Sequence, residues 1–374
     1  MPKNIYRGEP GFQHGEIPGV GVLLVNLGTP EAPTAAAVRP YLRQFLGDPR
    51  VIELPRLQWW LILNLIILTF RPKASAKLYE SIWTDEGSPL LVISEKIAAK
   101  MQDALRAKVG TPLHLELAMT YGEPSVPRGL AALRDKGCRR ILVLPLFAHY
   151  SSTSTGAAFD AVMKELMTWR RVPEIRTIHE YHGEPALIDA LARSIRESWE
   201  KDGEPEKLVL SYHGIPLRYF KGGDPYHCFC YKTTRLIAEQ LDLPEERYIT
   251  TFQSTFGKEE WLKPATDETL EELAKSGTKS VDVICPGFAI DCLETLEEID
   301  EENRHIFLEA GGEQFRYIPC LNDSDDHVAF LTDLVHRNLG GWVVEPGEFD
   351  EAAARAEGEA SRQRAEALRQ KKGY

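Results

Sequence analysis

The feature that most restricts the fold is a set of short apolar runs separated by helix-like segments. Residues 21–28 (GVLLVNLG) and 139–148 (RRILVLPLFA) are almost continuously apolar, which is typical of strands buried on both faces of a parallel sheet. Further strand-like runs lie at 113–121, 206–214, 247–254 and 279–289. Because helical patterns alternate with these runs, the sequence predicts an α/β fold with parallel sheets.

The order of the motifs occurs twice along the chain. A Gly-x-Pro turn follows the first strand, at 28–30, and the fourth strand, at 214–216. The motif Pro-x-Phe-Ala closes the third strand, at 145–148, and the sixth, at 286–289. This repeat predicts two pseudo-duplicated lobes. In open α/β sheets ligands bind beyond the carboxyl ends of the strands, so we expect motifs from both lobes to line one cleft.

The expected organisation has four parts. A loose leader (1–19) precedes an N-terminal lobe (20–175) with an apolar lip at about 55–72, and a C-terminal lobe (176–340) precedes a charged helical tail (341–374). The tail is rich in Ala, Glu and Arg and nearly free of large apolar residues, which favours a solvated helix over a catalytic element.

Charge and cysteine content exclude several classes of protein. The formal net charge of −12 argues against a nucleic acid partner, which needs basic surfaces, and is compatible with attracting cations. The leader has no apolar stretch typical of a secretory signal, so we expect a cytoplasmic location. The six cysteines include no CxxC pair and are expected to be free thiols.

The segment LQWWLILNLIILTF, at 57–70, is the one candidate for membrane contact. A bilayer-spanning helix takes about 20 apolar residues, so this segment is too short to cross. A helix of the core is one interpretation. The other is a helical lip, with Trp59 and Trp60 adjacent, that dips into a membrane interface or lines an apolar ligand pocket.

A row of carboxylates follows the sixth strand. On a helix beginning near Cys292, residues 294, 298 and 302 would stack on one face, and like charges at that spacing destabilise a helix by a few tenths of a kcal/mol per pair. A solvated surface helix remains the simpler interpretation. The absence of a nearby Lys or Arg before Arg304 favours the alternative, in which a divalent cation is the missing partner.

His213 ends the fourth strand, where an isolated histidine is more often structural than functional. Its position suggests more, because His213 and the acidic row both follow strands of the second lobe and could converge on one cleft mouth. An imidazole with carboxylates and no cysteine cage suits Fe²⁺, Co²⁺ or Zn²⁺ held loosely. The sequence therefore predicts a cation in transit, which means a substrate.

Several motifs in order resemble the ferrochelatase family, which inserts Fe²⁺ into a porphyrin to make haem. They are LVNLGTPEAP, LSYHGIP, GDPY, TFQSTFG, WLKP and FAIDCLETLEEID, and the resemblance spans roughly residues 20 to 337. It implies two Rossmann-like lobes around a porphyrin cleft. His213 and Glu294 match the family's active-site histidine and metal-handling glutamate, with Asp291, Glu298 and Glu302 behind them as further metal-handling acids.

The same resemblance assigns substrate-binding positions. Pocket-lining positions are matched by Tyr121, Trp261, Phe288 and Tyr181, and porphyrin propionates would be bound by Arg71 and Ser88. Relatives that act on coproporphyrin mostly carry tyrosine where this chain has Leu27, which favours protoporphyrin IX. Fe²⁺ is then a substrate and no prosthetic group is expected.

Two departures from the family pattern bear on cofactors. Some relatives hold an iron–sulfur cluster, with one cysteine in the stretch that matches HYSSTSTG; Ser152 occupies that place here, and no cysteine follows Cys320. We therefore predict no cluster. Cys292 stands where other members often have histidine, so no metal role is assigned to it.

Two other functions remain as alternatives. A related chelatase could insert iron into coproporphyrin III or cobalt into another tetrapyrrole, although the apolar lip suits a less carboxylated substrate. A two-lobed carrier could hold haem or porphyrin without chemistry, and would not need the acidic row. The partners expected are protoporphyrin IX and Fe²⁺, with peripheral contact to the inner membrane and no nucleic acid.

Overall fold

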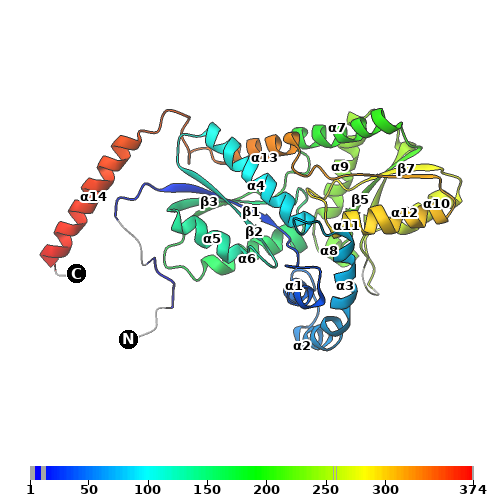
Figure 1. Cartoon of the computed structure of the whole chain (residues 1–374), viewed down its shortest axis with the longest axis horizontal. Helices are drawn as coiled ribbons and strands as arrows, with labels where there is room; N and C mark the ends of the chain where they lie inside the picture. Colours follow the sequence, from blue (N-terminus) through cyan, green and yellow to red (C-terminus); the bar gives the residue numbers. More distant parts are fainter. Residues whose placement is uncertain (1–4, 10–13, 256, 258, 373–374) are drawn as a thin grey trace.

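The computed structural model describes residues 5–9, 14–255, 257 and 259–372, which form two parallel sheets side by side (Figure 1). The first sheet has the order β2-β1-β3-β4 and the second the order β6-β5-β7-β8, with four strands each. The strands are β1 Gly19–Asn26, β2 Leu113–Met119, β3 Cys138–Pro145, β4 Glu174–Thr177, β5 Lys207–His213, β6 Tyr248–Gln253, β7 Ser280–Ile284 and β8 Gln314–Ile318.

The two sheets confirm the predicted α/β architecture and its duplication. Each strand of the first sheet has a counterpart at the same place in the second, and every pairing within a sheet is parallel. The six expected strands are present, and the structure adds β4 and β8 at the equivalent edges. The expected lobe boundary between residues 175 and 176 falls inside β4.

Helices cover both faces of each sheet. The first half of the chain contains α1 Ala35–Gly47, α2 Arg56–Leu61, α3 Leu68–Ile82, α4 Pro89–Lys108, α5 Val126–Asp135 and α6 Ala157–Leu166, with π-helical turns η1 Ile62–Ile67 and η2 Ser152–Gly156. The second half contains α7 Pro185–Asp202, α8 Leu217–Lys221, α9 Tyr226–Gln240, η3 Glu245–Arg247, α10 Thr266–Lys275, α11 Leu293–Leu296, η4 Glu298–Asn303, α12 Arg304–Glu309, α13 Asp325–Asn338 and α14 Glu351–Lys372.

The core follows from the two-residue period of the strands. In β1, Val22 and Leu24 join a large cluster shared by both lobes, whereas Leu23 and Val25 face α5 and α6. In the second lobe, the opposite face of the sheet is filled by side chains of α10 and α12, such as Leu270 and Phe307. Helix α13 packs against α4 and α7, so the C-terminal part of the chain helps to join the lobes.

A polar contact crosses between the lobes where β3 ends. His149, which is 2% exposed, hydrogen-bonds Thr233 of α9 through Nε2 at 2.8 Å. The Thr233 hydroxyl donates to the carbonyl of His182, so the imidazole of His149 donates its Nε2–H to Thr233. The two histidine rings lie 5.5 Å apart between centroids. Burial lowers the pKa of His149 to about 3 and that of His182 to about 4, so both rings are neutral.

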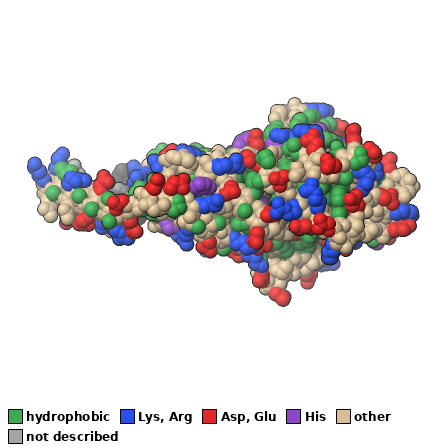
Figure 2. Space-filling model, turned by 90° about the horizontal axis from the view of Figure 1, so that it is seen from above, with side chains coloured by type: hydrophobic (Ala, Val, Ile, Leu, Met, Phe, Trp, Pro, Cys, Tyr) green, Lys and Arg blue, Asp and Glu red, His purple; other side chains and the backbone are tan. Residues whose placement is uncertain are grey.

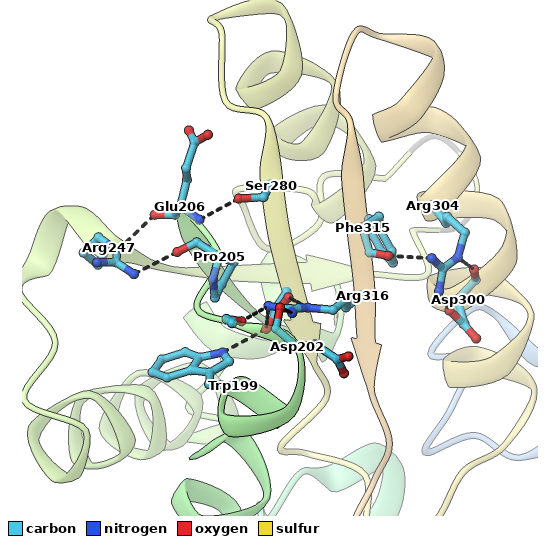
Figure 3. Close-up of polar contacts among 12 residues, drawn as sticks. Trp199, Asp202, Pro205, Glu206, Arg247, Ser280, Asp300, Arg304, Phe315 and Arg316 are labelled. Carbon is cyan, nitrogen blue, oxygen red and sulfur yellow. Dashed lines mark hydrogen bonds and ion pairs between the residues drawn. The ribbon is translucent and has the colours of Figure 1, made fainter. Parts of the chain in front are cut away.

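The second sheet also contains a buried ion pair between β7 and β8 (Figure 3). Asp282, fully buried, accepts hydrogen bonds from Arg316 Nε at 2.6 Å and from Trp199 Nε1 at 2.8 Å. Arg316 also donates to the carbonyls of Asp202 and Gly203. Desolvation raises the pKa of the Asp282 carboxyl, and the guanidinium of Arg316 opposes that rise.

The apolar segment at 57–70 lies in the insertion formed by α1, α2, η1 and α3, which projects from the body (Figure 1). Trp59 is buried and donates from Nε1 to the carbonyl of Leu46 at 2.6 Å, whereas Trp60 is exposed. The remaining large exposed side chains define an apolar face of the insertion: Leu57, Trp60, Leu61, Ile62, Leu65, Ile66 and Phe70. The segment is therefore a helical lip: Trp59 attaches one face to the rest of the insertion, and the opposite face is exposed. Among the described residues no helix is long and apolar enough to cross a membrane.

The described part of the leader and helix α14 lie at the same side of the molecule (Figure 1). In the leader, Arg7 pairs with Glu165 at 3.0 Å and Glu9 with Arg139 at 2.9 Å, so its described residues are tied to the first lobe instead of being loose. Helix α14 extends from the body as a narrow arm, and charged side chains of both signs cover the visible surface (Figure 2). A Cβ atom at Gly358 would lie 2.2 Å from the carbonyl oxygen of Gly15, so only glycine fits this contact.

Candidate functional site

The carboxyl ends of β5 and β6 begin the site. His213 and Gln253 are register partners at the ends of these neighbouring strands. The backbone N–H of Gly214 donates to the carbonyl of Gln253 at 2.7 Å, and a Cβ at Gly214 would lie 2.8 Å from that oxygen. The glycine of the second Gly-x-Pro turn thus lets β6 approach closely and fixes the backbone beside His213.

The imidazole of His213 is half-buried and held in one tautomer. Its Nδ1 lies 2.6 Å from the carbonyl oxygen of Gly214, which can only accept a hydrogen bond. Neutral His213 therefore carries its proton on Nδ1 and its lone pair on Nε2, the nitrogen that could take a proton or bind a metal. The ring of Phe288 lies 6.5 Å from that of His213 between centroids.

The acidic row does not form the regular α-helix that its spacing predicts. One short turn, α11, is followed by the π-helical η4, in which the N–H of Glu302 bonds to the carbonyl of Glu297 at 2.9 Å, five residues back. π-helical turns interrupt α-helices frequently at functional sites. Exposure increases along the row, because Asp291 is buried, Glu294 and Glu298 are half-buried, and Glu302 is exposed.

The end of β6 holds the backbone of Glu294 and the carboxylate of Glu298. Gln253 Nε2 donates to the backbone carbonyl of Glu294 at 2.7 Å, and Ser254 N–H donates to Glu298 Oε1 at 2.6 Å. Desolvation raises the pKa of Glu298, while Ser254 and the charge of His213 oppose the rise and the charge of Glu294 adds to it. The end of β6 therefore connects the strand that ends in His213 to the backbone of Glu294 and the carboxylate of Glu298.

Mutual repulsion is evident further along the row. Desolvation raises the pKa of Glu297, and the neighbouring carboxylates Glu302, Glu301, Glu298 and Glu294 raise it further. Arg304, the first basic residue after the row, pairs instead with Asp300. Within the described part of the chain no Lys or Arg forms an ion pair with these glutamates, so the row carries a negative charge that attracts cations.

Asp291 differs from the other members of the row because donors of the protein surround it. Its Oδ1 accepts from Tyr317 at 2.6 Å and Thr295 at 3.1 Å, and from the N–H of Cys320 at 3.3 Å. Its Oδ2 accepts from Asn322 at 2.6 Å. These bonds fix the turn that begins α11, so they favour a positioning role for this carboxylate.

Two of the expected substrate-binding residues lie beside His213 and its turn, and two others pack with the insertion. Trp261 packs on the turn after His213, where its ring would lie 3.3 Å from a Cβ at Gly214, and Phe288 faces the imidazole. Tyr121, just after β2, is buried against the insertion, and its hydroxyl donates to Asp48 at 3.0 Å. Leu27 packs in the same insertion cluster, which also contacts Leu293 and Leu296 on either side of Glu294.

The remaining expected residues make contacts of other kinds. Tyr181 is buried, donates to the carbonyl of Pro145 at 3.0 Å and packs against Phe330, as a core residue does. Ser88 is buried and accepts from Thr29 Oγ1 at 2.8 Å. Arg71 is exposed on α3 next to the apolar face, and partial desolvation lowers the pKa of its guanidinium.

Two tyrosines near Glu294 were not predicted from the sequence. Tyr41 of α1 and Tyr79 of α3 are buried, and their rings meet edge to face with the centroids 6.3 Å apart. Burial raises the pKa of both phenols, and the charge of Glu294 raises it further. Both residues lie in helical segments whose pattern indicates only a buried face, so no local signal distinguishes them from core residues.

Within residues 5–9, 14–255, 257 and 259–372, no three His, Cys, Asp or Glu side chains are close enough together to hold a metal ion. The arrangement offers a histidine lone pair and graded carboxylates, with aromatic rings from both lobes around them.

The fold and this histidine–carboxylate centre define a two-lobed α/β protein of the chelatase-like class. The solved structure of SirB from Bacillus subtilis with Fe³⁺ has the same fold, with a TM-score of 0.51 and 14% identity over 87% of this chain and 97% of that one. The family model named Ferrochelatase matches residues 19–339, and the chain belongs to the ferrochelatase family.

Relatives agree with this assignment over nearly the whole chain. The ferrochelatase of Thioalkalivibrio sulfidiphilus is 52% identical over 360 residues, which cover 96% of this chain and 98% of the relative. The ferrochelatase of Aromatoleum aromaticum is 54% identical over 341 residues, which cover 91% of this chain and 93% of the relative.

Proposed function

We propose that this member of the ferrochelatase family inserts ferrous iron into protoporphyrin IX to form protohaem, the terminal step of haem biosynthesis. The observation that supports the proposal is that the end of β6 joins the turn after His213 to the backbone of Glu294 and the carboxylate of Glu298. A haem carrier would need an axial ligand but no row of repelling carboxylates.

Metallation requires two pyrrole N–H protons to leave as Fe²⁺ sheds water and enters the ring. With its proton on Nδ1, neutral His213 would accept such a proton at the lone pair of Nε2. Glu294 and Glu298 would replace water around the arriving iron or pass on the departing protons. Exposed Glu302 would be the outer end of the same path, and Asp291 would hold the turn from which it starts.

Aromatic and apolar groups would form the walls of the porphyrin site. We assign this role to Phe288 and Trp261 from the second lobe and to Tyr121 and Leu27 from the first. A wall that bends the macrocycle would favour metal entry, because a planar ring resists an out-of-plane ion. Arg71, exposed on α3, would bind a propionate; Ser88 and Tyr181 are assigned to substrate by resemblance alone.

The chain is proposed to work without an iron–sulfur cluster. Ser152 replaces the cysteine that cluster-containing relatives have in this stretch, and its N–H donates to Asp224 at 2.8 Å. Fe²⁺ would then be a substrate only, with no resident cofactor.

The apolar face of the insertion supports peripheral contact with a membrane. Leu57, Trp60, Leu65, Ile66 and Phe70 are all more than half exposed, an unusual concentration for a surface kept in water. We propose that the protein acts in the cytoplasm and that this face rests on the inner membrane, from which an apolar porphyrin could enter. The lobes would then divide between β4 and α7, with the insertion as the membrane-facing part of the first.

An anaerobic assay with Fe²⁺ and protoporphyrin IX, followed by the absorbance change of haem formation, tests the function. We expect turnover by the wild type and at least about a hundredfold loss in His213→Ala, the scale of one general base. His305→Ala, on the exposed side of α12, is the matched control and should retain full activity. No turnover by the wild type, or full turnover by His213→Ala, would contradict the proposal.

A further inference from the structure

Ser254 is the first residue after β6 and has an unusual backbone. Its φ of 63° lies in the left-handed region, which a residue other than glycine seldom adopts. Such a conformation persists where surrounding contacts impose it, and it occurs often at functional sites. The contacts of Ser254 therefore indicate what the local geometry achieves.

Both donors of Ser254 bind the same carboxylate. The backbone N–H donates to Glu298 Oε1 at 2.6 Å, and the hydroxyl donates to Glu298 Oε2. The left-handed backbone turns the N–H and the side chain in the same direction, so the serine grips the carboxylate in a fork. One hydrogen bond to each oxygen leaves a second lone pair on each, since a carboxylate offers about four acceptor positions.

Other bonds tie this fork to the rest of the centre. The preceding residue, Gln253, donates from its side chain to the carbonyl of Glu294 and accepts at its own carbonyl the N–H of Gly214. On the other side, Asn303 Nδ2 donates to the carbonyl of Glu298 at 2.7 Å. A single strand end thus fixes the turn after His213, the backbone of Glu294 and the carboxylate of Glu298 relative to one another.

We propose that Ser254 is a positioning residue for metal handling, which orients the carboxylate of Glu298 so that its free lone pairs meet the incoming ferrous ion. The inference deepens the proposed function and rests on it. Groups that hydrogen-bond a metal-ligating carboxylate fix its direction, and their loss usually costs 10- to 100-fold in metal affinity or activity.

Ser254→Gly is the sharpest test, because glycine adopts the observed φ without strain and keeps the backbone N–H while it removes the hydroxyl. We expect the KM for Fe²⁺ to rise by about tenfold or more, with the KM for protoporphyrin IX and the melting temperature unchanged. A loss of packing alone would not separate the two substrates in this way.

The matched control is Asp242→Gly. Asp242 also has a positive φ, of 52°, and lies exposed after α9, away from the site. The variant Asp242→Gly shows what the removal of left-handed backbone strain does by itself, and its KM for Fe²⁺ should equal that of the wild type. In the background of Glu298→Gln, the change Ser254→Gly should add no further rise, because the hydroxyl then has no carboxylate to orient.

Binding of Co²⁺ to the protein without porphyrin, measured by calorimetry, separates this inference from the proposed function. Weaker binding by Ser254→Gly than by the wild type supports the role of Ser254 even if no haem is formed. Equal Co²⁺ affinities together with equal KM values for Fe²⁺ would overturn it. The inference would also be overturned if Ser254→Gly raised the KM for Fe²⁺ by the same factor in the Glu298→Gln background.

Discussion

The two sheets share one topology but fill an equivalent position with opposite chemistry. In the first sheet, Ile141 of β3 lies opposite Ile175 of β4; in the second, Asp282 of β7 lies opposite Arg316 of β8. The spacing to the Pro-x-Phe-Ala motif is the same in both lobes, and both Ile141 and Asp282 are fully buried. The fold therefore specifies the burial and the pairing at this position, while either an apolar pair or an ion pair can satisfy it.

The difference has consequences for how each lobe tolerates change. An apolar pair loses only packing when one member is shortened, whereas an ion pair that loses one member leaves a buried charge. The lobe that carries His213, Glu294 and Glu298 is also the one that uses buried charge in its framework. Substitutions of equal size should therefore affect the two lobes unequally.

The largest effect is expected from Arg316→Ile, which leaves the carboxylate of Asp282 buried without its cation. Breaking a buried pair in this way costs about 3–5 kcal/mol. Chemical denaturation should show this fall in the free energy of unfolding. The smaller change Ile175→Val at the equivalent position of the first lobe removes only packing and should cost no more than about 1.5 kcal/mol, and a loss equal to that of Arg316→Ile would break the comparison.

The Gly-x-Pro turns extend the comparison. Gly28 has a φ of 114°, and a Cβ there would lie 1.8 Å from the carbonyl oxygen of Tyr121. Gly28→Ala should therefore lower the free energy of unfolding by about 2–3 kcal/mol, measured by thermal unfolding.

At the second turn, a Cβ at Gly214 would lie 2.8 Å from the carbonyl oxygen of Gln253, a less severe clash. Gly214→Ala should therefore cost less stability but lower kcat, because this turn carries His213. A purely structural effect of Gly214→Ala would contradict the assignment of the site.

The junction between the lobes should respond to acid. Burial lowers the pKa of His149 to about 3, so below its unfolded pKa of about 6.5 the unfolded chain binds more protons than the folded protein. Neutral His149 therefore contributes in full to the free energy of unfolding above about pH 6.5, and this contribution is lost as the pH falls. At pH 5 the free energy of unfolding should be lower by about 2 kcal/mol. His149→Gln should show a flatter pH dependence of unfolding, whereas exposed His305→Gln should follow the wild type.

The smallest effect should come from converting the second lobe to the chemistry of the first. The double variant Asp282→Ile with Arg316→Ile removes both charges, and such replacements are often neutral or stabilising. The lost hydrogen bond from Trp199 opposes that gain by about 1 kcal/mol. We expect a free energy of unfolding within about 1 kcal/mol of the wild type. A loss as large as that of Arg316→Ile alone would show that the ion pair itself is needed.

The sequence predicted the parts of the fold that depend on local pattern. The buried runs of β1 and β3 and the repeated turns indicated the duplicated lobes correctly. The edge strands EIRT (β4) and QFRYI (β8) were missed, because they are short and contain charged residues. Their pairing depends on neighbours that are far apart in the chain.

For the candidate site, the signal in the sequence is residue type. His213 and the acidic row stand at strand ends, which parallel sheets bring together. The contribution of Ser254 depends on a contact across 44 residues and on a left-handed backbone, and neither is visible in a local pattern. The π-helical turn at Glu298–Asn303 was missed for a related reason, since the spacing of carboxylates fits a regular helix equally well.

The contact between Gly15 and Gly358 sets how freely the C-terminal arm can diverge. Most of α14 faces solvent, so drift in sequence there costs little as long as the residues remain polar and helix-forming. Position 358 is different, because even an alanine methyl would collide with the backbone of the leader. In related proteins with this contact, the sequence of α14 should therefore vary at most positions, while position 358 should remain glycine.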